Sequence, residues 1–289
     1  MTYRIAKFPS GIYNYRPMNR IEALQQTSDA RNWGMSCGLP LETMFVQEAA
    51  RPYFWWVYYA LPGDPNSIGV EYFGDEEEIA RKWNDETEKS GYDVFLIGSP
   101  GAGFDECPLS SALVDSSEQY RTHYMFHEGS HVWARKHLSG DREFPNDIDE
   151  GLAEVVGLEL MVNWYKDNKP NQVLLASDYV GYRVSVLTST QHLVETINCG
   201  DSAQLDLAIE EFLDANKKWK QNFKVSSNPG KRLTRREDFN FASLAYYSSY
   251  SSKFSEIRSY FQRNRINIID FLSNPFPHKD NLLKLAQTQ

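Results

Sequence analysis

Hydrophobic and polar residues in the first third of the chain follow the short pattern of a small sheet with helices beside it. Residues 53–60 are dense in aromatics and predict a buried strand, with a returning strand over 69–73 and a third over 92–97. Capping and stop residues predict helices over 19–33 and 75–89.

From residue 116 onward, apolar positions recur at helical spacing almost throughout. Breaks in this pattern fall near 140–147, 167–171, 199–201, 225–231 and 274–279. The sequence shows no repeat and no linker, so we expect an N-terminal α/β region (1–115) and a helical region (116–289) to form one compact unit. The expected fold class is α+β, a small sheet beside the helix that carries the active site, with a mainly helical C-terminal half.

Composition limits the functions open to this chain. Hydrophobic residues make up 41% of it, as in folded proteins, and the net charge of −9 argues against nucleic acid or anionic membranes as partners. Cys37, Cys107 and Cys199 form no CxxC pair, so we expect free thiols and no cysteine metal ligands. Residues 1–11 lack the apolar stretch of a signal peptide, and the longest apolar run, 53–61, is too short to span a bilayer. A cytoplasmic protein is therefore expected.

The strongest chemical signal is His127-Glu128-Gly129-Ser130-His131, which matches the zinc-hydrolase pattern HExxH. Residues four apart on a helix lie about 40° apart around its axis, so His127 and His131 can chelate one Zn²⁺ ion. Glu128, about 100° away, can act as general base on a water without binding the metal. Gly129 costs about 1 kcal/mol relative to alanine inside a helix, and close approach of another backbone would explain it.

A catalytic zinc needs a third protein ligand, and two residues compete for this role. His137 lies at the metzincin spacing from His127, but Ala134 replaces the glycine of that pattern. A helix that continues past Ala134 would rotate His137 about 120° away from His131. Glu150 follows His131 after eighteen intervening residues, enough to end one helix and begin a second that crosses it.

The second helix is expected to begin near Asp147 or Asp149, either of which can cap it. Glu154 lies one turn after Glu150 on the same face, where it can accept the second N–H of a zinc-bound histidine. His123 lies one turn before the motif. Three histidines four residues apart span about 12 Å, too far for one metal, so His123 is expected to be a neighbouring wall residue.

Several motifs together resemble a bacterial family of predicted aminopeptidases of the gluzincin type. The matching segments are 71–74, 91–94, 108–111, HExxH, 149–153, and 240–245 with Tyr250, spread from about residue 21 to about 260. In gluzincins a Glu-Gly-x-Ala segment like 150–153 carries the third ligand. The resemblance therefore implies a zincin-type helix, Glu150 as the third ligand and a role for Tyr250.

The expected activity is zinc-dependent hydrolysis of an amide or peptide bond, with one Zn²⁺ ion as cofactor and a peptide or small amide as substrate. The resemblance adds aminopeptidase activity to this expectation. A dedicated hydrolase acting on one small amide or peptide intermediate fits the same ligands. A non-catalytic metal-binding or interaction protein would have no need of Glu128. The sequence leaves the oligomeric state open.

Two expectations concern how the substrate is held. Tyr250 is the first candidate to stabilise the developing oxyanion, and Tyr246 and Tyr247 are the next candidates. The strand over 92–97, followed by a glycine-rich loop, is the nearest candidate for holding a peptide backbone at a sheet edge.

Overall fold

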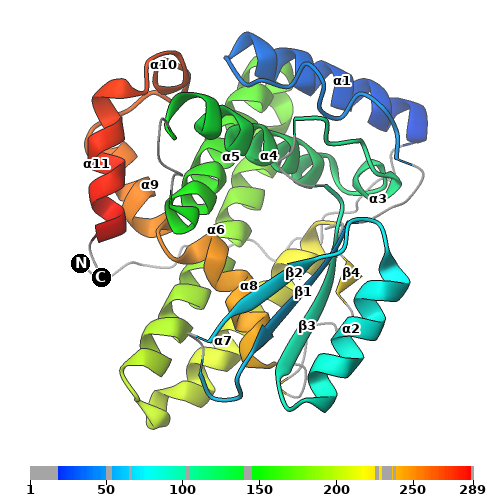
Figure 1. The fold of residues 1–289 in the computed structure, drawn as a ribbon. Coiled ribbons are helices and arrows are strands. Elements are labelled where there is room, and N and C mark those ends of the chain that lie inside the picture. The colour runs from blue at the N-terminus through cyan, green and yellow to red at the C-terminus, as the bar shows by residue number, and fades with distance from the viewer. Residues whose placement is uncertain are drawn as a thin grey trace.

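The computed structural model of the chain describes residues 19–49, 54–64, 67–101, 105–139, 145–224, 228–229, 236 and 239–287. In these residues the protein is mainly helical, with one small antiparallel sheet, so the predicted α+β class is confirmed. Figure 1 shows the sheet at one side of the molecule, with helix α2 (Glu77–Lys89) outside it and most other helices on its opposite side.

The sheet has three main strands, β1 (Phe54–Ala60), β2 (Gly69–Tyr72) and β3 (Asp93–Ser99), and a two-residue strand, β4 (Asn228–Pro229). Their order is β2-β1-β3-β4, and all neighbours are antiparallel. The three predicted strands are confirmed. Strand β3, expected to hold a substrate backbone at a sheet edge, lies between β1 and β4 in this order, but β4 pairs only with its residues Ile97 and Gly98, so the expectation stays a prediction.

Successive side chains of a strand point to opposite faces of the sheet. The residues of β1 therefore alternate between two different environments. Trp55 and Val57 are buried in a small core against helix α2 (Glu77–Lys89). Trp56 and Tyr58 point to the other face, where they line a cleft.

Helix α8 (Phe241–Ser251) joins the sheet to the helical part of the protein. Its cap residue Asn240 donates a hydrogen bond from Nδ2 to the carbonyl of Val94 at 2.9 Å, and the Asp93 carboxylate accepts one from the Phe241 amide at 3.0 Å. From this anchor on β3, α8 packs against β1, β3 and two long helices, α5 (Asn146–Asn168) and α6 (Val173–Asn198).

Helices α4 (Glu118–His137) and α5 (Asn146–Asn168) pack closely along their length. They meet at Gly157 of α5, where an added Cβ would lie 3.1 Å from the backbone nitrogen of His127 and 3.2 Å from its Cα. A side chain at this position would therefore push the two helices apart.

The remaining helices complete the molecule. They are α1 (Arg20–Ser36), α3 (Ser111–Val114), the 3₁₀ turn η1 (Pro170–Gln172), α6 (Val173–Asn198), α7 (Ser202–Asn222), α9 (Phe254–Arg263), α10 (Ile268–Ser273) and α11 (Phe276–Gln287). One hydrophobic core contains residues from both sides of the division expected at residue 115, among them Phe95 and Phe126. The boundary itself stays a prediction.

Most predicted helix ends agree with the structure to within a few residues. Two breaks between C-terminal helices, at 252–253 and at 264–267, were not predicted. The expectation that Asp147 or Asp149 caps α5 is wrong: the helix begins at Asn146, and both carboxylates lie in its first turn, where they still favour the positive end of the helix dipole.

Parts of three expectations lie outside the described residues. These are the predicted breaks near 140–147 and 225–231, and the N-terminal residues 1–11. No helix in the described ranges is both long and apolar enough to cross a membrane.

Gly157→Val is expected to lower the free energy of unfolding by about 1–3 kcal/mol, because overpacking at this contact must displace the His127 backbone. The control is Glu159→Val, which places the same side chain at an exposed position of α5 and should cost well under about 1 kcal/mol. Denaturant unfolding measures both variants, and equal losses would show that the helices do not need this close approach.

Candidate metal centre

Helix α4 carries the whole HExxH segment on a buried stretch. Ser117 caps the helix by accepting a hydrogen bond from the Tyr120 amide. The two poor helix formers in the motif have local explanations. A Cβ at Gly129 would meet Leu41 Cδ2 at 2.6 Å, and the Ser130 hydroxyl donates to the carbonyl of Phe126 at 2.6 Å. The close neighbour of Gly129 is thus a leucine side chain rather than another backbone.

Three side-chain atoms converge where α4 faces the beginning of α5. The Nε2 atoms of His127 and His131 lie 3.1 Å apart, and Glu150 Oε2 lies 3.4 Å from the first and 3.5 Å from the second. Glu150 Oε2 is buried and accepts no hydrogen bond in the structure. A tetrahedral zinc with bonds of about 2.0–2.1 Å sets its ligand atoms about 3.3–3.4 Å apart. The three atoms therefore already have nearly the spacing that one zinc ion requires.

Carboxylates of α5 stand behind both imidazoles. His131 Nδ1 lies 2.8 Å from Asp149 Oδ2, and His127 Nδ1 lies 3.9 Å from Glu154 Oε1, beyond hydrogen-bonding distance. Metal-bound histidines usually donate their second N–H to such a group, which fixes the tautomer and the ring orientation. Asp149 makes this contact directly, whereas Glu154, expected for the role, faces His127 from farther away.

Glu154 is held mainly by Arg183 of α6. The guanidinium donates to both carboxylate oxygens, from Nε at 3.2 Å and through a second, shorter contact from Nη2. The Arg183 Cζ also lies 4.8 Å from the centre of the Trp219 ring and 5.6 Å from that of Tyr250. Arg183 thus connects the carboxylate behind His127 to a tyrosine of the cleft.

A second group of possible ligands, His123, His127 and Glu154, lies on the far side of the His127 ring. His123 Nε2 is 3.4 Å from Glu154 Oε2, and its Nδ1 is 3.0 Å from the Tyr179 hydroxyl. Because Arg183 already pairs with Glu154, a further cation there would be repelled. The group with Glu150 is therefore the better metal candidate. His123, expected to be a wall residue, does not line the cleft next to that group but a smaller cavity behind it.

Burial and neighbouring charges shift the pKa values of the site in opposite directions. Burial raises the pKa of Glu128, although His127 and His131 oppose the rise. Burial would also raise the pKa of Glu150, but the two histidines outweigh it and lower the value to about 2. Burial disfavours a charged His131, yet Glu150 and Asp149 raise its pKa well above the ordinary value. Glu150 is therefore ionised, as a metal ligand must be.

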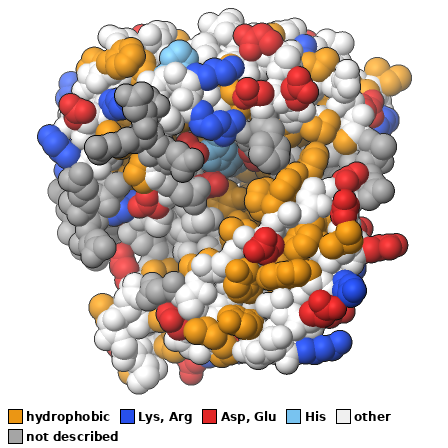
Figure 2. All heavy atoms as spheres, viewed as in Figure 1, with side chains coloured by type: hydrophobic (Ala, Val, Ile, Leu, Met, Phe, Trp, Pro, Cys, Tyr) orange, Lys and Arg blue, Asp and Glu red, His pale blue; other side chains and the backbone are white. Residues whose placement is uncertain are grey.

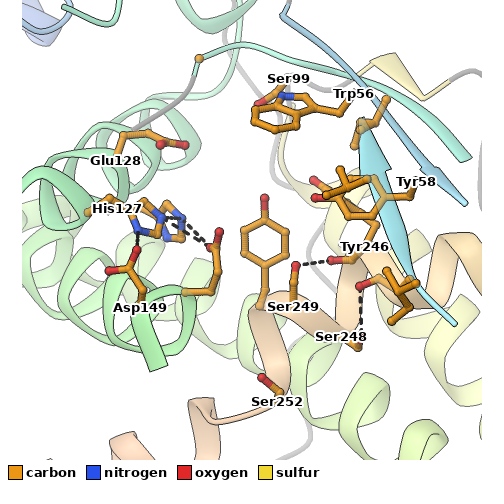
Figure 3. Close-up of a pocket in the computed structure, with 18 of the residues that line it drawn as sticks. Trp56, Tyr58, Ser99, His127, Glu128, Asp149, Tyr246, Ser248, Ser249 and Ser252 are labelled. Atoms are coloured by element: carbon orange, nitrogen blue, oxygen red, sulfur yellow. Dashed lines mark hydrogen bonds and ion pairs between the residues drawn. The ribbon is translucent and has the colours of Figure 1, made fainter. Parts of the chain in front are cut away.

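Glu128 points into the cleft from α4, on the other side of His127 from Asp149 (Figure 3). Next to it is Tyr124, whose hydroxyl donates to the carbonyl of Gly101 at 2.8 Å and contacts Ser99 Oγ at 2.7 Å. These contacts hold the end of β3 against α4, so the Glu128 carboxylate faces the space between the helix and the sheet.

The cleft has a volume of about 500 Å³. One wall is the HExxH helix and the start of α5, the opposite wall is the face of the sheet, and serines and tyrosines of α8 close the end (Figure 3). Figure 2 shows a histidine at the bottom of a hollow in the middle of this face, with hydrophobic side chains gathered on the neighbouring sheet.

The three tyrosines considered as oxyanion donors differ in their position relative to the cleft. Tyr250 and Tyr246 line the cleft, and the Tyr250 ring centre lies 5.8 Å from that of His127. The Tyr247 hydroxyl instead hydrogen-bonds to Asn216 at 3.3 Å, away from the cleft. The structure thus keeps Tyr250 and Tyr246 as candidates for contact with a substrate.

His127, Glu128, His131, Glu150 and Tyr250 are brought to one cleft, and Glu154 lies behind it. His137 does not reach this cleft. It is exposed at the end of α4, and its ring packs against Trp133 with centres 5.3 Å apart. The helix does run on past Ala134, which rotates His137 away as predicted.

Sequence reasoning missed two kinds of residue. It assigned Asp149 to helix capping, although its position next to Glu150 in a predicted first turn was a usable signal. Arg183 and the sheet residues Trp56 and Tyr58 gave no signal, because only packing of distant segments brings them to the site. Comparison of the chain with protein-family models, curated proteins and solved structures finds no match.

Arg183→Met is expected to destabilise the metal-free protein by about 3–5 kcal/mol, because it leaves the Glu154 carboxylate, 1% exposed, without its guanidinium partner. The double variant Arg183→Met with Glu154→Gln removes the buried charge and should recover much of the loss. Denaturant unfolding of the single and double variants measures this. A double variant no more stable than Arg183→Met would show that the pair is not the cause.

Proposed function

We propose that this protein is a zinc-dependent hydrolase of amide or peptide bonds, similar in its ligand set to gluzincin metallopeptidases. The observation that carries the proposal is the convergence of His127 Nε2, His131 Nε2 and Glu150 Oε2 at mutual distances of 3.1–3.5 Å. Two imidazoles and one carboxylate are a donor set typical of catalytic zinc, which keeps its fourth position for water or substrate.

A zinc ion held by these residues would act as a Lewis acid and lower the pKa of a coordinated water. Asp149 and, at a greater distance, Glu154 orient the two imidazoles so that both Nε2 atoms face the centre. Burial keeps competing water away from this wall and strengthens each electrostatic contact in it.

Glu128 is suited to general acid–base work. Its carboxylate points into the cleft beside the ligands without joining them, and burial raises its pKa above the ordinary value of a glutamate. In the proposed reaction it accepts a proton from the attacking water and delivers it to the leaving amine. The phenolic hydroxyl of Tyr250, which lines the cleft, would donate to the developing oxyanion.

Two finer expectations belong to the same proposal: that α4 is a zincin-type active-site helix, and that the activity is that of an aminopeptidase. The cleft of about 500 Å³ favours a short peptide or one small amide, so a dedicated hydrolase of a single intermediate is the second candidate. A purely structural metal site would gain nothing from Glu128 in the cleft.

Purified protein is expected to bind about one zinc ion per chain. Glu150→Ala should abolish this binding, because it removes one of the three converging ligands. The matched control is His137→Ala, which removes an exposed histidine of the same helix. Atomic absorption measures the zinc content, and loss of zinc in the His137 variant alone would return the third-ligand role to His137.

Glu128→Gln is expected to retain zinc and to lower kcat by at least about 10²–10⁴-fold, since the amide cannot accept the proton of the attacking water. A screen of amino-acid amides and blocked peptides identifies a substrate for the assay. Full activity of the zinc-loaded variant would exclude the mechanism, and zinc binding with no hydrolysis of any amide by the wild-type chain would favour a non-catalytic metal protein.

Tyr250→Phe is expected to lower kcat by about 10²–10³-fold with little change in KM, as removal of an oxyanion donor does. Tyr247→Phe is the control, because its hydroxyl bonds to Asn216 outside the cleft. If steady-state kinetics show a loss only for Tyr246→Phe, the donor is the neighbouring tyrosine of the cleft instead.

A further inference from the structure

The two long walls of the cleft differ sharply in chemistry. Among the described lining residues, every acidic or basic side chain comes from α4 or α5: His127, Glu128, His131, Arg135, Asp149 and Glu150. The sheet contributes aromatic and aliphatic side chains, with Ser99 at the end of β3: Trp56, Tyr58, Ile68, Val70 and Ile97. The bond-breaking groups thus face an apolar wall across the cleft.

The strand register makes this wall one continuous surface. Trp56 lies opposite Ile97 of β3, and Tyr58 lies opposite Val70 of β2, so all four side chains project from the same face. Ring contacts hold the two aromatics: Trp56 packs on Tyr72 with centres 4.4 Å apart, and Tyr58 packs edge-on against Tyr246 at 5.3 Å. The wall is therefore a preformed surface rather than a set of loose side chains.

The outer part of the wall is exposed to an unusual degree for its residue types. Ile68, Val70 and Tyr72 are 42–47% exposed, whereas Trp55 and Val57, on the opposite face, are buried against α2. The exposed residues Ile68 and Val70 line the same cleft as the candidate ligands His127, His131 and Glu150. This shared cleft argues for a substrate rather than for a separate protein partner.

We propose that the sheet wall formed by Trp56, Tyr58, Ile68 and Val70 is the subsite for a large apolar side chain of the substrate, next to the amide that is cleaved. The inference rests on the proposed hydrolase function and names its substrate class: short peptides or amides carrying an aromatic or branched aliphatic side chain. The ionised wall receives the reacting amide, and the sheet wall takes the side chain out of water.

The kinetic test uses the zinc-loaded full chain and blocked peptides that differ at one position on either side of the scissile bond. Phe and Leu peptides should exceed their Gly counterpart in kcat/KM by about 10- to 100-fold, and Asp and Lys peptides should be poorer still. Val70→Asp should reduce kcat/KM for the Phe peptide at least about tenfold and leave the Gly peptide within about threefold.

Ile79→Asp is the matched control, because Ile79 of α2 is an equally exposed apolar residue (52%, against 47% for Val70) outside the cleft. It should leave the preference unchanged. Val70→Thr, close to valine in shape, covers the case in which the aspartate variant does not fold, and it should reduce the preference in the same direction. A Gly peptide cleaved as well as the Phe peptide, or an equal loss on both in Val70→Asp, would overturn the subsite.

A binding measurement separates this inference from the proposed function. Calorimetry on the Glu128→Gln protein compares N-acetyl-phenylalaninamide with N-acetyl-glycinamide, which requires no turnover. Tighter binding of the phenylalanine probe, lost in the added Val70→Asp variant, supports the subsite even if no peptide is hydrolysed. Equal binding of both probes refutes the subsite, even if the enzyme proves to be a peptidase.

Discussion

The close approach of α5 to α4 at Gly157 is the contact on which the candidate site depends. The two helices are consecutive, so their facing stripes run in opposite directions. His123, His127 and His131 lie along one, and Gly157, Glu154 and Glu150 lie along the other. Because Gly157 has no side chain, the α5 backbone reaches that of His127, and each glutamate meets the imidazoles. A larger residue would separate the stripes and lose the ligand spacing.

This arrangement buries several charges, and each is compensated by a specific partner. Glu150 faces two histidines, Asp149 pairs with His131, and Glu154 pairs with Arg183. An ion taken out of water without such a partner would be strongly destabilising. Arg183 has the further effect of excluding a second cation behind His127. On the side of α6, the charge of Glu154 is therefore neutralised by Arg183. On the other side, the candidate ligands face the cleft.

The sheet completes the site from the other side although it supplies no candidate ligand. The contacts of Asn240 and Phe241 with β3 anchor helix α8, and the Tyr124 hydroxyl ties the end of β3 to α4. These contacts set the width between an ionised helical wall and an apolar sheet wall. A cleft with opposite chemistry on its two sides would suit the proposed substrate, which has both a polar bond to break and an apolar group to bury.

Residue patterns over short stretches of the chain predict the local elements and the residues proposed for the centre. Three strands and the long helices follow from residue periodicity, and His127, Glu128 and His131 from spacing on one helix, since these depend on neighbours within a few positions. Glu150 followed from its distance along the chain and the resemblance. Packing of distant segments alone reveals the contact of Asp149 with His131, the pairing of Arg183 with Glu154, and the position of Tyr250, but not Tyr247, in the cleft. Helix crossing and strand order depend on contacts between residues far apart in the chain, such as Arg183 with Glu154 and Gly157 with His127, and no local pattern records them.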